Sequence, residues 1–276
     1  MMREDFAAFI LTHGRADRVE TFKTLRNCGY TGKIYIVIDD EDKTADEYRK
    51  RYGDMVLQFG KADIAKTFDE GDNFNDRRAI IYARNACFDL ARQVGVKYFV
   101  ELDDDYHWFG YRFEKGYTIR SLDDVFASLV DFLENTATDS IAFSQGGDHI
   151  GGAETPIKLK RKAMNSFVCS TEKPIQFFGR INEDVNLYTA GSRRGMVFFT
   201  LTSIQLNQKE TQTKEGGMTD IYRSAGTYIK SFYTVMYSPS CTKISTMGRF
   251  NPRLHHLINW NATAPLIIRE EYKKRT

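Results

Sequence analysis

The sequence predicts an α/β fold with a mostly parallel sheet flanked by helices and an elaborated C-terminal half. Two observations support this prediction. Over the first hundred residues, short apolar runs alternate with segments whose apolar residues recur at spacings of three and four, as strands and amphipathic helices do. Polar or acidic residues also follow directly after three of the apolar runs, where parallel sheets place their ligand-binding crevice.

The first strand-turn-helix unit occupies residues 6–30. The apolar run 6–11 (FAAFIL) ends in the polar stretch 12–15 (THGR), and a helical spacing of apolar residues follows over residues 16–30. Gly29 is a typical helix stop. We therefore expect a β-turn-α unit with the polar stretch at the carboxyl end of its strand.

The unit repeats toward residue 100. Residues 33–42 (KIYIVIDDED) predict a second strand that runs into acid, and residues 55–59 predict a third. A helix is expected over residues 77–95, with Asn75 or Asp76 as its N-cap. Residues 96–102 then form another strand, which places three aspartates just past its carboxyl end.

The second half of the chain is more mixed. We expect a helix over residues 121–136, strands over 140–147 and 196–202, and a long helix over 218–237. No linker-like tract or internal repeat separates the two halves. One domain spanning residues 1–276 is therefore predicted.

Composition excludes several classes of protein. The 39 basic and 37 acidic residues leave a net charge of +2, so binding to a polyanion would need a local patch. The four cysteines include no CxxC pair and are expected to be reduced. The longest apolar stretch is too short for a membrane span and "MMRED" begins no signal peptide, so a cytoplasmic protein without membrane contact is predicted.

Three consecutive aspartates, Asp103, Asp104 and Asp105, interrupt an otherwise apolar and aromatic stretch. Adjacent carboxylates repel, so either they lie in a solvated turn or a bound cation compensates them. Asp103 and Asp105 form an acidic pair with Asp104 between them. Such a pair suits Mg²⁺ or Mn²⁺, which would neutralise the charge of a nucleoside-diphosphate leaving group.

Three arginines belong to the helix expected before these aspartates. Arg84 has the planar donor fork that suits a diphosphate, and Arg77 and Arg78 would add charge at the helix start, where amide groups favour anions. The alternative is an ordinary basic helix face.

A second acidic pair, Glu183 and Asp184, follows an aromatic-rich lead-in. A carboxylate near the cation could act as the general base that takes a proton from an acceptor hydroxyl. The pair also suits the first turn of a helix capped by Asn182, and both interpretations can hold together.

The remaining candidate features each have two interpretations. His255 and His256 could complete the metal shell or form a surface pair. The basic stretch 158–162 could contact DNA phosphates or lie in a solvated loop. The aromatic cluster 106–109 could stack on a base, although core packing is the stronger expectation, and the glycine-rich stretch 144–152 is interpreted as a substrate-facing loop.

The ordered motifs "THGRA", "YARNACFD", "ELDDDY", "FGRINEDVN" and "RLHH" resemble those of glycosyltransferases of the GT-A (Rossmann-like) fold. The chain looks most like the phage TET-associated glycosyltransferases, relatives of the kinetoplastid base J glucosyltransferase. The resemblance spans residues 6–260. It implies transfer of a sugar from a UDP-sugar to the hydroxyl of 5-hydroxymethylcytosine or 5-hydroxymethyluracil in phage DNA, in the host cytoplasm.

The resemblance also implies roles for individual residues. Residues 1–106 would bind the nucleotide sugar, and residues 107–276 would bind the acceptor and supply the base. Asp184 is the preferred base, with Glu183 as the alternative, and inversion at the anomeric carbon is expected. The resemblance further implies Asp103 and Asp105 for metal and nucleotide, Arg84 for the diphosphate, and Thr12 and Arg15 for the nucleoside, with Asp39 as a further candidate for the uridine. His13, Arg77 and Asp104 are additional candidates for contacts with the nucleotide sugar, and His255 and His256 are candidates for the metal.

Other functions remain open from the sequence. A transferase of the same fold could use a glycan, lipid or protein acceptor. A nucleotidyltransferase lacks support because no glycine-rich N-terminal phosphate loop is present. A catalytically silent DNA-binding module would need neither the acidic motif nor the arginines.

Overall fold

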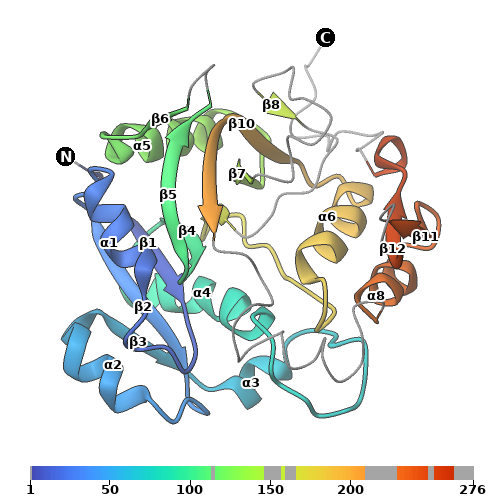
Figure 1. Ribbon diagram of the computed structural model, residues 1–276, viewed down its shortest axis with the longest axis horizontal. Helices are drawn as coiled ribbons and strands as arrows, with labels where there is room; N and C mark the ends of the chain where they lie inside the picture. Colours follow the sequence, from blue (N-terminus) through green and yellow to red (C-terminus); the bar gives the residue numbers. More distant parts are fainter. Residues whose placement is uncertain are drawn as a thin grey trace.

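A computed structural model describes residues 2–112, 116–145, 157–158, 166–208, 229–247 and 252–263, with only the backbone of residues 157, 158 and 247. Its main element is a ten-stranded sheet with the order β3-β2-β1-β4-β9-β7-β10-β5-β6, and β8 pairs with β10 (Figure 1). The strands are β1 (Phe6–Leu11), β2 (Lys33–Asp39), β3 (Val56–Phe59), β4 (Tyr98–Asp103), β5 (Tyr106–Tyr111), β6 (Tyr117–Thr118), β7 (Ser140–Ser144), β8 (Ile157–Lys158), β9 (Ser166–Ser170) and β10 (Phe198–Gln208). The helices are α1 (Glu20–Asn27), α2 (Ala45–Tyr52), α3 (Lys61–Ala65), α4 (Ile81–Gln93), α5 (Leu122–Asn135), α6 (Glu183–Arg193) and α8 (Ile229–Tyr237).

The N-terminal half of the sheet is parallel. Strands β3, β2, β1 and β4 pair side by side in the same direction, with Leu11 opposite both Val37 and Asp103. Parallel strands buried on both faces read as continuous apolar runs, which is why these strands were predictable. The register brings the residues that follow β1, β2 and β4 to one edge of the sheet, as the sequence predicts.

The C-terminal half of the sheet is mixed. Strand β9 runs antiparallel to both β4 and β7, β10 runs parallel to β7, and β5 runs antiparallel to β10. The α/β prediction is confirmed, but the parallel arrangement applies mainly to the first half. Hydrophobic periodicity gives no strand direction, so the sequence could not show this difference.

Two hydrophobic cores lie on the two faces of the sheet. Strand β1 supplies both, because its even-numbered residues pack with α1, α2 and α5 and its odd-numbered residues pack with α3, α4 and α6. Tyr106 and Phe109 are buried in the first core, as the preferred interpretation of the aromatic cluster expected. The two covered faces leave the carboxyl edge of the parallel strands as the place for ligands.

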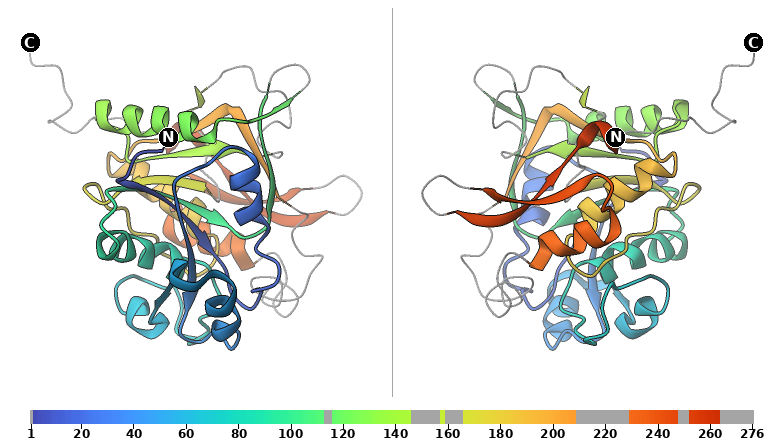
Figure 2. Two further views of the ribbon diagram at one scale, coloured as in Figure 1. Left: turned by 90° about the vertical axis from the view of Figure 1, so that its left-hand side faces the viewer. Right: turned by 90° about the vertical axis from the view of Figure 1, so that its right-hand side faces the viewer.

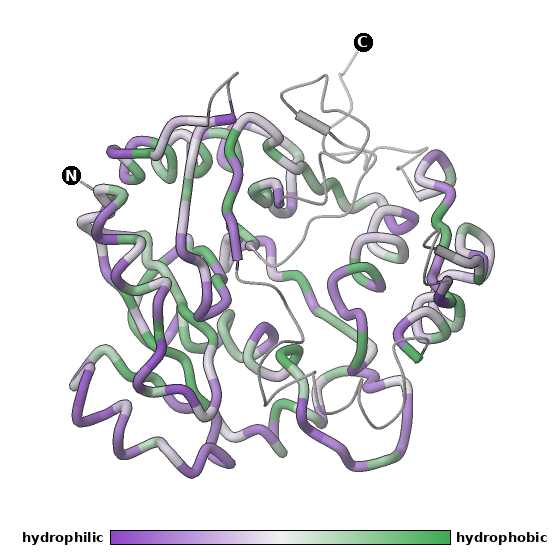
Figure 3. The backbone as a smooth tube through the Cα atoms, in the orientation of Figure 1, coloured by the Kyte–Doolittle hydropathy of each residue, from purple (hydrophilic) through white to green (hydrophobic). Residues whose placement is uncertain are grey.

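Helix boundaries differ from those expected at the predicted site. The helix predicted from residue 77 begins at Ile81, because Asn75 has a left-handed backbone (φ 56°) and the Asp76 side chain accepts the Arg78 amide. Helix α2 was not predicted, since it buries only Tyr48 and is almost wholly hydrophilic (Figure 3). Its pattern therefore carries little apolar periodicity.

The last described strands of the chain form a small unit beside α6. Strands β11 (Thr242–Met247) and β12 (Arg253–Ile258) form a separate antiparallel sheet that contacts α8 and projects from the body of the molecule (Figure 2). The predicted helix 218–237 is described only from Ile229. Most of the glycine-rich stretch 144–152 and the basic side chains at 158–162 lie outside the described residues.

No helix in the described ranges is long and apolar enough to cross a membrane.

Candidate active site

The acidic turn formed by residues 103–105 after β4 is held by hydrogen bonds to the start of α1. The Thr21 hydroxyl donates to the Asp103 carbonyl at 2.6 Å and accepts from the Tyr106 amide at 2.9 Å, and the Thr21 amide donates to the Asp104 carbonyl. Because three backbone groups of residues 103–106 bond to one residue, the turn is held in a defined conformation. The three aspartates therefore do not lie in a loose, solvated loop.

The middle aspartate faces inward. Asp104 is buried, and its carboxylate accepts a 2.6 Å hydrogen bond from the Thr12 hydroxyl and pairs with Arg15 at 3.2 Å. The Tyr48 hydroxyl completes the link, since it contacts Thr12 and accepts from the Arg15 amide at 2.8 Å. Asp104 thus ties the stretch 12–15 to the acidic turn, which makes it a structural anchor in this arrangement.

Arg84 occupies the centre of a buried group that we call the arginine cluster, which consists of Arg84, Glu101, Asp103 and Glu183. Its guanidinium is 1% exposed and lies 3.1 Å from Glu183, 3.5 Å from Asp103 and 3.5 Å from Glu101. The rings of Phe167 and Phe177 flank it at 5.0 and 5.7 Å. One cation from α4 thereby joins the end of β4 to the start of α6.

The position of Arg84 differs from the exposed one that direct contact with a diphosphate would need. A guanidinium enclosed by three carboxylates and two rings has no exposed donor for a diphosphate. Its charge instead compensates the acidic side chains above it, because buried carboxylates require a paired cation. Arg84 is therefore paired with the acidic groups in this structure, and its contact with a diphosphate stays a prediction.

The carboxylates of the arginine cluster have raised pKa values, chiefly because they are buried. Burial raises the pKa of Glu101 to about 8 and that of Asp103 to about 7, although Arg84 opposes both shifts. Burial and the neighbouring Asp184 charge also raise the pKa of Glu183. A cation bound at Asp103 would favour the ionised form of that carboxylate.

Glu183 and Asp184 occupy the first turn of α6, as predicted, but their surroundings differ. Glu183 accepts from Arg84, whereas the Oδ1 atom of Asp184 accepts from the Val185 amide at 2.8 Å. The side chain of the preceding Asn182 bonds to Thr234 on α8 and does not cap the helix. Because Glu183 is committed to Arg84, the arrangement favours Asp184 as the base candidate.

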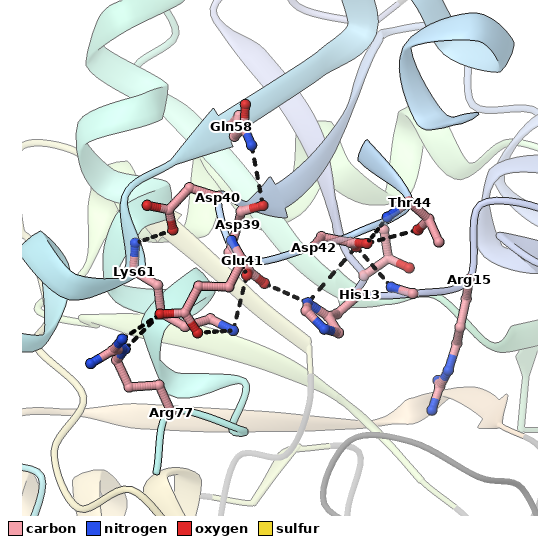
Figure 4. A network of polar contacts seen from close by, with 12 residues as sticks. His13, Arg15, Asp39, Asp40, Glu41, Asp42, Thr44, Gln58, Lys61 and Arg77 are labelled. Carbon is pink, nitrogen blue, oxygen red and sulfur yellow. Dashed lines mark hydrogen bonds and ion pairs between the residues drawn. The ribbon is translucent and has the colours of Figure 1, made fainter. Parts of the chain in front are cut away.

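A second polar group lies at the carboxyl ends of β1 and β2 (Figure 4). We call it the edge network, and it consists of His13, Gly14, Asp39, Asp42 and Lys61. Asp39 is buried and contacts His13 at 2.7 Å and Lys61 at 3.0 Å, while Asp42 accepts from the Gly14 amide at 2.7 Å. Burial raises the pKa of Asp39, but the bonds from His13 and Lys61 outweigh it and the net shift is downward. The Asp39 bond raises the pKa of His13.

The stretch 12–15 connects the two groups. Thr12 and Arg15 hold Asp104, while His13 and Gly14 contact Asp39 and Asp42. The sequence correctly predicted that these residues share one edge of the sheet.

Arg77 and Arg78 are not where the sequence placed them. They precede α4, so they do not lie at its first turn. Arg77 pairs with Glu41 at 2.5 Å and extends the edge network, and Arg78 pairs with Asp76 at 2.8 Å. The predicted placement of both arginines at the helix start is therefore wrong, and their binding of an anion stays a prediction. Arg77 lies close to Lys61 through their shared partner Glu41.

The expected metal ligands are only partly brought together. His255 and His256 lie on β12 with their rings 4.2 Å apart, and the described residues include no group of three or more metal-ligating side chains. Asp103 and Asp105 still fit a cation shared with substrate, because Mg²⁺ commonly uses one or two carboxylates plus phosphate oxygens. That donor set does not fit a cage made by protein alone.

Sequence reasoning missed Glu101 and Lys61. Glu101 is 0% exposed in the apolar strand β4, and Lys61 is buried against Asp39. A single acid within "KYFVEL" was a readable signal, since charged residues are rarely buried unless they are paired. Lys61 carried no comparable signal because α3 is short and polar.

Comparison with known proteins adds the family. The sequence profile of the TET-associated glycosyltransferases matches residues 6–217. The chain belongs to this family. As a TET-associated glycosyltransferase it is an enzyme of the transferase class, which the resemblance of its motifs had predicted.

Solved structures resemble this TET-associated glycosyltransferase weakly. Glucosyl-3-phosphoglycerate synthase from Mycobacterium tuberculosis, in complex with Mg²⁺ and UDP, matches with a TM-score of 0.49 and 8% identity over 92% of this chain and 88% of that one. TarS residues 1–349 from S. aureus match with a TM-score of 0.44 and 11% identity over 84% and 65%. A search of curated proteins finds no match.

Proposed function

We propose that this enzyme transfers a sugar from a UDP-sugar to the hydroxyl of a 5-hydroxymethylpyrimidine, 5-hydroxymethylcytosine or 5-hydroxymethyluracil, in phage DNA. Family membership supports glycosyl transfer. The DNA acceptor is suggested by the family name alone. The observation that supports one reaction centre is the junction at Arg84, which brings Asp103, a candidate ligand of a donor-bound cation, and Glu183, the neighbour of the candidate base, to the same guanidinium.

In this proposal the first half of the chain, residues 1–106, binds the donor. The edge network supplies His13, Asp39 and Lys61 for the nucleoside end, since these groups offer both donors and acceptors at the carboxyl edge of the sheet. Asp103 and Asp105 would hold Mn²⁺ or Mg²⁺, which when bound neutralises charge on the departing diphosphate. Arg84 keeps Asp103 in place beneath.

The second half, residues 107–276, binds the acceptor and supplies the base. Asp184 would take the proton of the attacking hydroxyl at Oδ2, because its Oδ1 already accepts from the Val185 amide. Direct attack opposite the leaving group gives inversion at the anomeric carbon. His255 and His256 remain candidates for completing the cation shell, and the reaction is proposed to take place in the host cytoplasm.

Calorimetric titration of UDP into the purified protein, with Mn²⁺ and with EDTA, tests the donor site. We expect binding that requires Mn²⁺ and is lost in Asp105→Asn. As a matched control, Asp54→Asn changes an exposed acid that precedes β3, at the end of the strand opposite to the carboxyl edge, and this variant should bind UDP normally. Binding that is equal in EDTA, or unchanged in Asp105→Asn, would remove the proposed metal site.

A further inference from the structure

One long part of the chain contains no acidic residue. Between Asp220 and Glu270 the sequence has no Asp or Glu, although 37 of its 276 residues are acidic. The same segment carries six Lys or Arg residues. The nearly neutral total charge of the chain thus conceals a cationic segment, which lies beyond residue 217, where the family match ends.

The structure places part of this segment on an exposed sheet face. In the β11–β12 pairing, Lys243 lies opposite Leu257 and Arg253 lies opposite the backbone of residue 247, so Lys243, Arg253 and Leu257 project from one face because side chains alternate along a strand. Lys243, Arg253 and Leu257 are exposed. We call this surface the basic face; its two cations are four positions apart along the ladder, roughly 13 Å.

The two cations of the basic face are not neutralised. Neither Lys243 nor Arg253 forms an ion pair within the described parts of the chain, whereas most other described arginines do. Leu257 on this face is 59% exposed. Cations beside an exposed apolar side chain suit a nucleic acid, which offers both phosphates and ring faces.

The basic face is fixed to the helix that carries the candidate base. The described contacts join α8 to α6 through Asn182 to Thr234, Thr189 to Ser238 at 2.8 Å, and Arg193 to Ser240 at 2.6 Å. After β12, Trp260 packs edge-on against Tyr188 of α6 at 5.4 Å. Since α6 spans about 16 Å, a DNA strand bound to the basic face would lie at a set distance from Asp184.

We propose that the basic face, Lys243 and Arg253 with the adjacent Leu257, is a docking surface for the phosphate backbone of the DNA acceptor. This inference rests on the proposed function. Charge complementarity selects the occupant, because an acid-free cationic surface attracts a polyanion in a chain whose remaining charge is slightly negative. Phosphate contacts of this kind position the acceptor without selecting its sequence.

Fluorescence anisotropy with a short labelled duplex containing 5-hydroxymethylcytosine tests the proposal. Lys243→Gln combined with Arg253→Gln should weaken binding about tenfold near 0.1 M salt and lower the slope of log K against log salt by about two. The control is Lys50→Gln with Arg51→Gln, two exposed cations on α2 at the opposite end of the molecule (Figure 1). Calorimetric UDP binding should be unchanged in both variants.

The outcomes separate this inference from the proposed function. If the wild type binds and modifies DNA but the Lys243/Arg253 variant keeps the wild-type affinity and salt slope, the basic face is not the docking surface. An equal loss in the α2 control would also overturn it. Sedimentation with phosphatidylserine vesicles that depends on Lys243 and Arg253, without an effect on DNA binding, would assign the face to a lipid. A wild type that binds UDP but no DNA contradicts the proposed acceptor itself.

Discussion

Replacement of Arg84 by methionine should destabilise the protein strongly and in a pH-dependent way. The substitution keeps the approximate length of the side chain and removes its charge, which leaves Glu101, Asp103 and Glu183 buried around an apolar group. Each of these carboxylates lies 3.1 to 3.5 Å from the guanidinium, so each attraction is worth about 5 kcal/mol at an effective dielectric of 20 when the carboxylate is ionised. Desolvation offsets most of this, and breaking a buried pair costs about 3–5 kcal/mol net.

The pH dependence follows from the carboxylates left behind. Without Arg84 their pKa values rise further, so they are protonated at low pH and must be charged, at a cost, at high pH. The destabilisation by Arg84→Met should therefore be larger at pH 8 than at pH 5.5. Arg92→Met, on the same helix but 48% exposed, should change the free energy of unfolding by less than about 0.5 kcal/mol.

Urea denaturation of wild type, Arg84→Met and Arg92→Met at both pH values measures these differences. A destabilisation of under about 1 kcal/mol, or one that is the same at pH 5.5 and pH 8, would refute the view that Arg84 compensates the buried carboxylates as they ionise.

Three further predictions concern neighbouring groups. Asp184→Asn should lower the rate of sugar transfer at least about 100-fold, while UDP binding measured by calorimetry stays unchanged. A normal turnover rate in Asp184→Asn would indicate that Glu183 is the base. Glu101 has a folded pKa of about 8, above its ordinary value, so it contributes stability below about pH 4.5 that is lost as the pH rises to 8. Glu101→Gln should lack this loss. Chemical unfolding measures the free energy of unfolding at pH 5 and pH 8.5, and a change between them that is as large in Glu101→Gln as in the wild type would contradict the assignment. Thr12→Val removes the hydroxyl that donates to Asp104 and should cost about 1–3 kcal/mol in the same assay, with an unchanged midpoint as the contrary result.

The sequence predicted the parts of the fold that depend on local patterns. Strands β1, β2 and β4 were found because they are buried apolar runs, and the polar residues after them were correctly placed at one edge. Helix α5 was found from its apolar stripe. These features need no knowledge of distant contacts.

The features that the sequence did not predict depend on partners far away in the chain. From the sequence, Arg84 was interpreted as a donor to a diphosphate. Its hydrogen bond to Glu183, 99 positions away, is known only from the structure. From the sequence, Asp104 was interpreted as a ligand of the nucleotide. Its hydrogen bonds from Thr12 and Arg15 are known only from the structure. The start of α4 moved to Ile81 because a loop conformation at Asn75, which propensity does not encode, replaces the expected cap.

The most direct test of the proposed function is a transfer assay. The purified enzyme is incubated with Mn²⁺, individual UDP-sugars and DNA that contains 5-hydroxymethylcytosine or 5-hydroxymethyluracil, and the digested nucleosides are analysed by mass spectrometry. We predict a modified nucleoside heavier by one sugar residue, formed by the wild type and not by Asp184→Asn. Unchanged nucleosides with every donor, from an enzyme that binds UDP and DNA, would contradict the proposed reaction.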